Sequence, residues 1–291
     1  MTDLKYAVIT PVRDEAEYIA ETVESMAAQT LPPQKWVVVD DGSSDRTPEI
    51  LDAASAKYPW IEVIHRLNRG FRKSGGGVIE AFYDGYRSLN GTKWELLVKL
   101  DGDLSFAADY FQKCFAHFSA DRHLGIGGGV VCVSENGNLV EEAPGDPPFH
   151  VRGATKIYAR ACWEQISPLI EAPGWDTIDE VKANMLGWTT RTFRDLKLTQ
   201  HKATGAGDGA WRNWFKNGLA NYVTGYHPAF MIAKCIKRAT SRPGSLEWIA
   251  LWAGFCSGYL KSVPRVDDAR VIRYLRQQQV RRLSGRSGIY G

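Results

Sequence analysis

The sequence lacks a long hydrophobic run. Its longest mostly apolar stretch, residues 246–260, has fifteen residues, too few for a helix to span the roughly 30 Å hydrocarbon core of a bilayer. Residues 1–5 carry no apolar signal region, so we expect a cytoplasmic protein rather than a secreted one. A membrane-spanning protein is not expected.

Cysteine is scarce and scattered. The 291 residues include five cysteines with no close pair, whereas zinc clusters and disulfide frameworks need cysteines at short, regular spacings. We therefore predict reduced thiols and neither of those structures.

Two glycine-rich nucleotide motifs are also missing. After the first apolar run, residues 10–15 read Thr-Pro-Val-Arg-Asp-Glu instead of Gly-x-Gly-x-x-Gly, which argues against NAD or FAD. The glycines at 75–77 lack a following Lys-Ser or Lys-Thr, so they form no phosphate loop of the Walker type. Their backbone amides at a helix start remain able to hold a phosphate, and a flexible loop is the alternative.

The composition is that of a globular protein, with 44% hydrophobic and 24% charged residues. This length favours one large α/β unit with an appendage. Apolar segments rich in branched residues alternate with segments of helical periodicity, which predicts a parallel sheet covered on both faces. The expected strands are 6–11, 36–40, 61–65 and 94–100, and the expected helices are 14–29, 47–58 and 78–89.

Acidic turns follow the predicted strands. In a parallel sheet, ligands bind at the carboxyl ends of the strands, where Asp101 and Asp103 fall. These two carboxylates repel each other unless a cation lies between them, which makes a divalent-metal site plausible. Gly102 between them lets a metal-bound diphosphate approach the backbone. An ordinary Asp-Gly turn is the alternative.

Three stretches, residues 9–15, 37–47 and 99–103, resemble the signatures of family 2 glycosyltransferases in order and spacing. Residues 73–77 and 100–105 are similar to the dolichol-phosphate mannose synthase branch. The resemblance implies an α/β GT-A fold, a Rossmann-like, mostly parallel sheet with helices on both faces. It also implies inverting transfer of a sugar from a nucleotide donor, assisted by Mg²⁺ or Mn²⁺.

The resemblance also implies the residues that bind the donor and the metal. Arg212 is the nearest match to the family's Gln-x-x-Arg-Trp motif, and a structural role is the alternative for His201. The expected donor-binding residues are Thr10, Pro11, Arg13, Glu15, Asp40, Asp41, Lys73, Asp101, Gly102 and Arg212. The expected metal ligands are Asp101, Asp103 and His201.

Asp176 is the candidate general base. It lies eleven residues before Gly187, as the base does in the family, and Trp175 stands where the family usually has glutamate. A carboxylate near a helix N-terminus stays ionised and can accept a hydroxyl proton; a helix N-cap is the alternative. Asp179 and Glu180 are expected to be solvated. The expected acceptor-binding residues are Gly153 and Trp175.

We expect three regions along the chain. Residues 1–105 form the nucleotide-sugar-binding half and residues 106–225 the acceptor-binding half, followed by a basic, amphipathic helical extension at 226–291. The second half should contain a strand at 127–133, a polar loop at 136–149, a helix at 158–166 and a strand at 189–193.

Charge divides the chain. Residues 1–190 hold 18 Lys and Arg against 28 Asp and Glu, and residues 191–291 hold 18 against 5. The basic part is expected to face an anionic partner. Aromatic residues of the segment 246–260 share one helical stripe that suits an anionic membrane surface, while packing on the core or in a dimer is equally consistent. These are Trp248, Trp252, Phe255 and Tyr259.

Together these features predict a glycosyltransferase of polysaccharide biosynthesis, peripheral at the inner face of a membrane and without a nucleic-acid partner. Its donor is expected to be a UDP-, GDP- or dTDP-sugar, and its acceptor a hydroxyl of a glycan or lipid-linked glycan. Three alternatives remain. They are a polyprenyl-phosphate glycosyltransferase, whose anionic acceptor needs no base, a sugar nucleotidyltransferase, and a non-catalytic binding protein.

Overall fold

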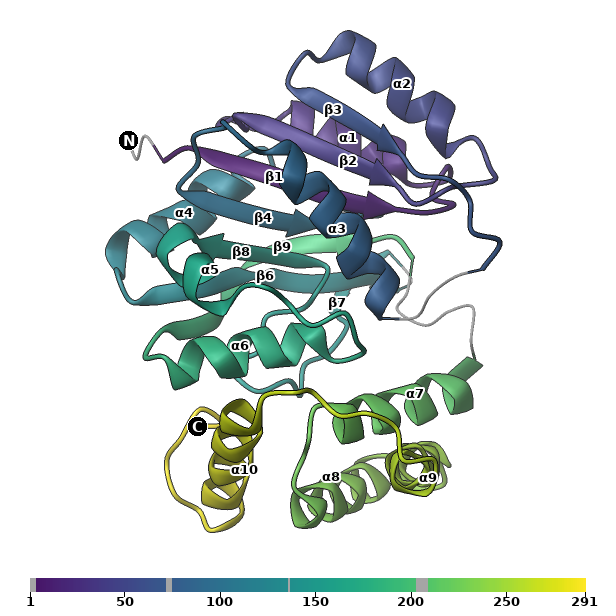
Figure 1. Cartoon of the computed structure of the whole chain (residues 1–291), viewed down its shortest axis with the longest axis vertical. Coiled ribbons are helices and arrows are strands. Elements are labelled where there is room, and N and C mark those ends of the chain that lie inside the picture. The colour runs from purple at the N-terminus through teal and green to yellow at the C-terminus, as the bar shows by residue number, and fades with distance from the viewer. Residues whose placement is uncertain (1–3, 72–74, 136, 203–208) are drawn as a thin grey trace.

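A single mixed sheet forms the centre of the computed structural model, which describes residues 4–71, 75–135, 137–202 and 209–291 (Figure 1). Within these residues the strand order is β3-β2-β1-β4-β8-β6-β9-β5, and β7 pairs with β6. The strands are β1 Tyr6–Val12, β2 Lys35–Asp40, β3 Ile61–His65, β4 Leu96–Leu100, β5 Leu104–Phe106, β6 Leu124–Glu135, β7 Asn138–Glu141, β8 Thr155–Ala159 and β9 Thr189–Gln200.

The expected parallel arrangement holds for one half of the sheet. Strands β3, β2, β1 and β4 are parallel, but β8 runs antiparallel to both β4 and β6. No helix lies between β6 and β8 in the described chain, and a return without a crossover helix produces antiparallel pairing. The helix expected at 158–166 therefore begins later, after β8, and the loop expected at 136–149 contains β7.

Helices cover both faces of the sheet, as expected (Figure 1). Alternate residues of the central strands face opposite sides, so Val8 packs with α1, α2 and α4, and Ile9 packs with α3, α5 and α6. The helices are α1 Ile19–Ala27, α2 Thr47–Lys57, α3 Gly76–Ser88, α4 Tyr110–Ala120, α5 Arg160–Ile166, α6 Trp175–Met185, α7 Gly209–Val223, α8 Pro228–Ser241, α9 Glu247–Leu260 and α10 Ala269–Leu283.

A buried ionic cluster attaches α6 to the sheet. Lys156 of β8 lies 2.8 Å from both the Asp179 and the Glu180 carboxylate. Tyr158 donates to Asp179 at 2.7 Å, and His150 Nδ1 lies 2.8 Å from Glu180. The expectation that Asp179 and Glu180 are solvated was wrong: both are buried, and these partners offset the cost of burying their charge.

The cluster changes the protonation of its members. Burial by itself lowers the pKa of His150, but the adjacent Glu180 carboxylate outweighs it and raises that pKa to about 8. Burial raises the pKa of Asp179 to about 6 against the opposing effect of Lys156. Since charged partners surround each group, the first turn of α6 has a fixed position on the sheet.

The C-terminal extension is a helical layer beside α6 (Figure 1). Helices α7 and α9 cross so closely that a Cβ on Gly254 would lie 2.0 Å from the Phe215 carbonyl oxygen. Although α7 precedes residue 226, it therefore packs on α9. No described helix combines the length and apolar composition needed to cross a membrane.

The aromatic stripe of α9 is used only in part for packing within the protein. Phe255 is buried, and its ring and that of Tyr259 pack against Tyr222 of α7. Trp252 in turn contacts the ring of Phe255. Trp248 and Tyr259 keep 37% and 46% of their surface exposed, so contact of this stripe with a membrane or a second subunit stays a prediction.

Gly254→Ala should lower the free energy of unfolding by about 1–3 kcal/mol, because the new methyl group forces the α7 and α9 backbones apart. Urea denaturation measures the loss. Gly145→Ala is the control, since a Cβ there meets no atom within 4 Å. A Gly254→Ala protein more stable than wild type would contradict the close crossing, because without a clash alanine should stabilise the helix by about 1 kcal/mol relative to glycine.

Stability should fall as pH rises through 8 because of His150. Its pKa is raised in the folded protein, from 6.5 to about 8, so its contribution is complete below pH 6.5 and is lost above pH 8. The loss amounts to about 2 kcal/mol. Urea denaturation between pH 6 and 9 should show this fall in wild type and in the control His123→Gln, whose histidine is exposed, but not in His150→Gln. An identical pH profile in His150→Gln would refute the assignment.

Candidate active site

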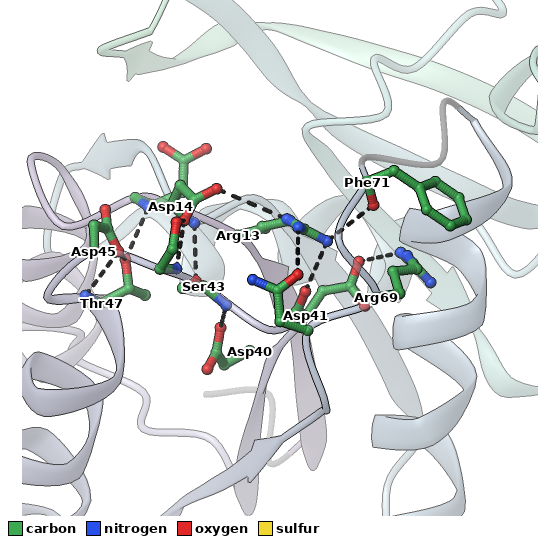
Figure 2. Close-up of polar contacts among 12 residues, drawn as sticks. Arg13, Asp14, Asp40, Asp41, Ser43, Asp45, Thr47, Arg69 and Phe71 are labelled. Carbon is green, nitrogen blue, oxygen red and sulfur yellow. Dashed lines mark hydrogen bonds and ion pairs between the residues drawn. The ribbon is translucent and has the colours of Figure 1, made fainter.

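The loops that follow β1 and β2 interlock at one edge of the sheet (Figure 2). The Arg13 guanidinium donates to the Asp41 carbonyl at 3.2 Å and to the Phe71 carbonyl at 3.1 Å. The Asp14 carboxylate accepts from the Ser44 amide at 2.7 Å. Arg13 therefore joins the loops after β1, β2 and β3, and its side chain holds these loops together.

The two carboxylates at the end of β2 are both engaged. Asp40 accepts a hydrogen bond from the Ser43 amide at 2.9 Å and lies 3.0 Å from His65 Nδ1. Asp41 pairs with Arg66 and Arg69. Sequence reasoning missed these three partners, although β3 follows β2 and His65 is the register partner of Asp40. Arg66 and Arg69, just after β3, were the signal in the sequence that could have indicated cationic partners for Asp41.

Three predicted donor residues make contacts that support the sheet. Thr10 is buried and accepts a hydrogen bond from Trp36 Nε1 at 2.8 Å, and Pro11 lies within β1. A Cβ on Gly102 would lie 2.5 Å from Val12 Cγ1, so the glycine allows close packing against β1. The roles of these three residues in donor binding stay predictions.

Two further residues were predicted to bind the donor. Arg212 is in the first turn of α7 with an exposed side chain. Lys73 lies outside the described residues. Their roles in donor binding stay predictions.

The acidic turn after β4 contains two different carboxylates. Asp101 pairs with the buried ammonium of Lys99, a partner that sequence reasoning missed. Asp103 is buried and accepts a hydrogen bond from Gln200 Nε2 at 3.1 Å. Burial, together with the charges of Asp101 and Glu15, raises the pKa of Asp103 to about 7. Asp103 is thus the carboxylate of the turn that lacks a cationic partner in the described residues.

The surroundings of Asp103 fit a hard divalent cation. Gln200 Oε1 is buried without a hydrogen-bond partner, and it belongs to the amide that donates to Asp103. The described residues contain no group of three or more potential Asp, Glu, His or Cys ligands. Mg²⁺ at phosphate sites needs only one or two carboxylates, with phosphate oxygens and water as the other ligands.

His201 lies beside this turn but contacts other groups. Its amide donates to the Asp103 carbonyl at 2.9 Å. Its Nε2 lies 2.9 Å from both Ser105 Oγ and Glu21 Oε2. Ligation by Nε2 would require the ring to leave these partners, so this role stays a prediction. The next residue, Lys202, lies 3.1 Å from Glu15 Oε1, a link that sequence reasoning missed.

The predicted base lies beside Gly153. A Cβ on Gly153 would lie 3.3 Å from Asp176 Oδ2 and 3.2 Å from the Trp175 ring. Gly174, not Asp176, is the N-cap of α6, so the alternative role of Asp176 as N-cap was wrong. No hydrogen bond or salt bridge engages the Asp176 carboxylate among the described residues.

Lys99 connects the acidic turn to the predicted base. It pairs with Asp101 and donates to the Gly153 carbonyl at 2.6 Å. Its ammonium lies 5.4 Å from the centre of the Trp175 ring, and that of Lys156 lies at the same distance. The structure therefore brings together Asp101, Gly153, Trp175 and Asp176, which are far apart in the sequence.

Comparisons with known proteins show the family of this chain. The family model described as glycosyl transferase family 2 matches residues 7–166, more than half of the chain. Glycosyltransferase AglE of Haloferax volcanii is 30% identical over 138 residues, which cover 47% of this chain and 42% of AglE. The match thus spans less than half the length of that relative.

Solved structures share the fold at low identity. The mannosyltransferase PcManGT from Pyrobaculum calidifontis, in complex with GDP-Man and Mn²⁺, has a TM-score of 0.57 and 17% identity, covering 99% of this chain and 77% of its own. TarS 1-349 of S. aureus, in complex with UDP-GlcNAc, has a TM-score of 0.57 and 18% identity, covering 97% and 93%. The chain therefore belongs to glycosyl transferase family 2, and its fold is the GT-A fold of these glycosyltransferases.

Proposed function

We propose that the protein is a metal-dependent, inverting hexosyltransferase that moves a sugar from a nucleotide donor to a hydroxyl of a glycan or lipid-linked glycan. One observation carries the proposal. A Cβ on Gly153 would lie 3.3 Å from Oδ2 of the predicted base Asp176, and the Gly153 carbonyl accepts a hydrogen bond from Lys99, the partner of Asp101. A donor diphosphate at the acidic turn and an acceptor hydroxyl at Asp176 would then be close enough to react.

Asp176 accepts the proton of the acceptor hydroxyl in this mechanism. It is the second residue of α6, where the helix dipole favours the ionised carboxylate, and its half-buried side chain remains accessible. The buried cluster of Lys156, Asp179 and Glu180 holds this turn in place. The hydroxyl oxygen attacks the anomeric carbon as Asp176 takes its proton. The bond from that carbon to the nucleoside diphosphate breaks on the opposite face, and this single displacement inverts the carbon.

The donor is held by the acidic edge of the sheet. In this proposal, Asp40 and Asp41 at the end of β2 contact the base and ribose of the donor. Asp103, together with Asp101 and Gln200, lies next to the diphosphate. Mg²⁺ or Mn²⁺ bound there would neutralise charge on the leaving diphosphate. Desolvation of Asp103 favours such a cation, because a buried carboxylate without a positive partner is costly.

A donor screen tests the proposal most directly. The related structures contain GDP-Man and UDP-GlcNAc, so nucleotide release should be measured across UDP-, GDP- and dTDP-sugars with manganese present. We expect one nucleotide class to be released well above the others. Absence of release and of binding for all three would favour a non-catalytic role.

A polyprenyl-phosphate acceptor is the second candidate. The excess of basic residues over 191–291 favours an anionic acceptor and a peripheral position on the inner, cytoplasmic face of a membrane. Such an acceptor is already ionised and needs no general base. The role of Asp176 therefore distinguishes the two acceptor classes.

Asp103→Asn should abolish Mn²⁺ binding measured by calorimetry, and with it nucleotide release, because the amide cannot supply the negative charge. EDTA should stop nucleotide release by the wild-type protein. Asp109→Asn is the control, since that carboxylate only pairs with Lys113 on the surface. Full activity of Asp103→Asn in EDTA would eliminate the metal assignment.

Asp176→Asn should reduce turnover by about 10² or more, the usual scale for loss of a general base. Donor affinity measured by calorimetry should stay near the wild-type value. Glu171→Gln, a change at an exposed residue before α6, should leave both quantities unchanged. Turnover close to wild type in Asp176→Asn would instead favour the polyprenyl-phosphate acceptor.

A further inference from the structure

Helix α10 has one buried stripe and one open basic stripe. Val271, Leu275 and Gln279 are buried and fix the helix against the rest of the protein. The opposite stripe lines a groove of about 750 Å³. Its lining includes the side chains of Arg265, Ile272, Arg273, Arg276, Val280 and Arg281.

The arginines of this groove have no acidic partners. No carboxylate lines the groove, and no salt bridge among the described residues involves its four guanidinium groups. Arg265 is held over the rings of Tyr222 and Tyr259 at 4.4 and 4.9 Å, and its buried Nε has no hydrogen-bond partner. Arg276 uses its Nε for the Gly225 carbonyl at 2.8 Å. Most of the N–H donors in the groove are therefore available to a ligand.

The chemistry of the groove specifies the class of ligand. Guanidinium groups bind phosphate oxygens in pairs, and the apolar side chains of Ile272 and Val280 lie along the same stripe. The volume is in the range of small-molecule sites. We propose that the groove binds the phosphate or diphosphate group of an amphipathic molecule, whose apolar part lies along Ile272 and Val280.

Short contacts link the groove to the helix that carries the predicted base. Arg276 donates to the Gly225 carbonyl at 2.8 Å, and the preceding residue, Thr224, packs on Gly174, where a Cβ would lie 2.4 Å from Thr224 Cγ2. Gly174 is the N-cap of α6, two residues before Asp176. Figure 1 shows α10 beside α6. We therefore assign the bound phosphate to a phosphorylated acceptor, an assignment that rests on the proposed function.

Pyrophosphate binding in EDTA tests the groove without the metal that the donor site needs. Calorimetry compares the wild type with Arg273→Ala/Arg281→Ala, two exposed groove residues. Affinity should fall about tenfold or more, because two charge-assisted contacts are removed. The matched control is Arg270→Ala/Arg286→Ala, which removes the same charge from exposed positions outside the groove and should change affinity less than about twofold.

Vesicle sedimentation distinguishes the sources of the phosphate. Binding to phosphatidylglycerol vesicles but not to phosphatidylcholine vesicles, lost in the groove variant and displaced by pyrophosphate, would identify a lipid headgroup. Groove-dependent binding of pyrophosphate without vesicle binding would identify a soluble phosphorylated acceptor. Equal losses in the groove and control variants, or no binding of either probe, would overturn the proposal.

Donor hydrolysis in the absence of acceptor separates this inference from the proposed function. Without acceptor, the groove variant should hydrolyse the donor at the wild-type rate, because its substitutions are on α10 and not at the acidic turn. With a phosphorylated acceptor present, its transfer rate should fall. Asp103→Asn should in turn keep the groove-dependent binding of pyrophosphate. Loss of acceptor-free donor hydrolysis in the groove variant would show that the arginines act at the donor site and would overturn the assignment to the acceptor.

Discussion

The proposed active site depends on two buried lysines that lie side by side on neighbouring strands. Lys99 of β4 and Lys156 of β8 are register partners, and both ammonium groups lie against the Trp175 ring. Two like charges in a core would be unstable alone. Asp101 neutralises the first lysine, while Asp179 and Glu180 neutralise the second. The aromatic ring adds cation–π attraction to both.

In the proposed function, this pairing explains how one sheet would hold both reactants. The parallel half carries the loops proposed to bind the nucleotide, and Lys156 of the antiparallel strand β8 holds α6 with the predicted base beside them. Gly153 is the point of contact, because a side chain there would press on Asp176 and Trp175. The mixed topology is thus the feature that would join the proposed donor and acceptor sides.

The C-terminal helices form a layer beside α6. Part of their aromatic surface is used for packing, as the contact of Phe255 with Tyr222 shows, whereas Leu246, Trp248 and Leu260 are exposed. The separation of charge along the chain has a spatial counterpart, since carboxylates follow β2 and β4, and guanidinium groups without acidic partners among the described residues line the groove on α10. In the proposed function, such an arrangement would orient an anionic acceptor away from the carboxylates that hold the donor.

The sequence by itself determined the family, the order of the first elements and the acidic turns. The Asp-Gly-Asp turn and the position of Asp176 before Gly187 are local patterns, and the strand at Ile61–His65 was predicted with the observed bounds. Such features follow from periodicity and motif spacing over a few residues.

Only the tertiary structure decided which charges are paired. Lys99 is a strand residue in the sequence, and nothing nearby shows that it neutralises Asp101 and also reaches Gly153. Asp179 and Glu180 have the pattern of a solvated helical turn, but they are buried because β8 supplies Lys156 beneath them. Burial and ion pairing depend on contacts between segments far apart in the chain, and short-range patterns do not encode those contacts.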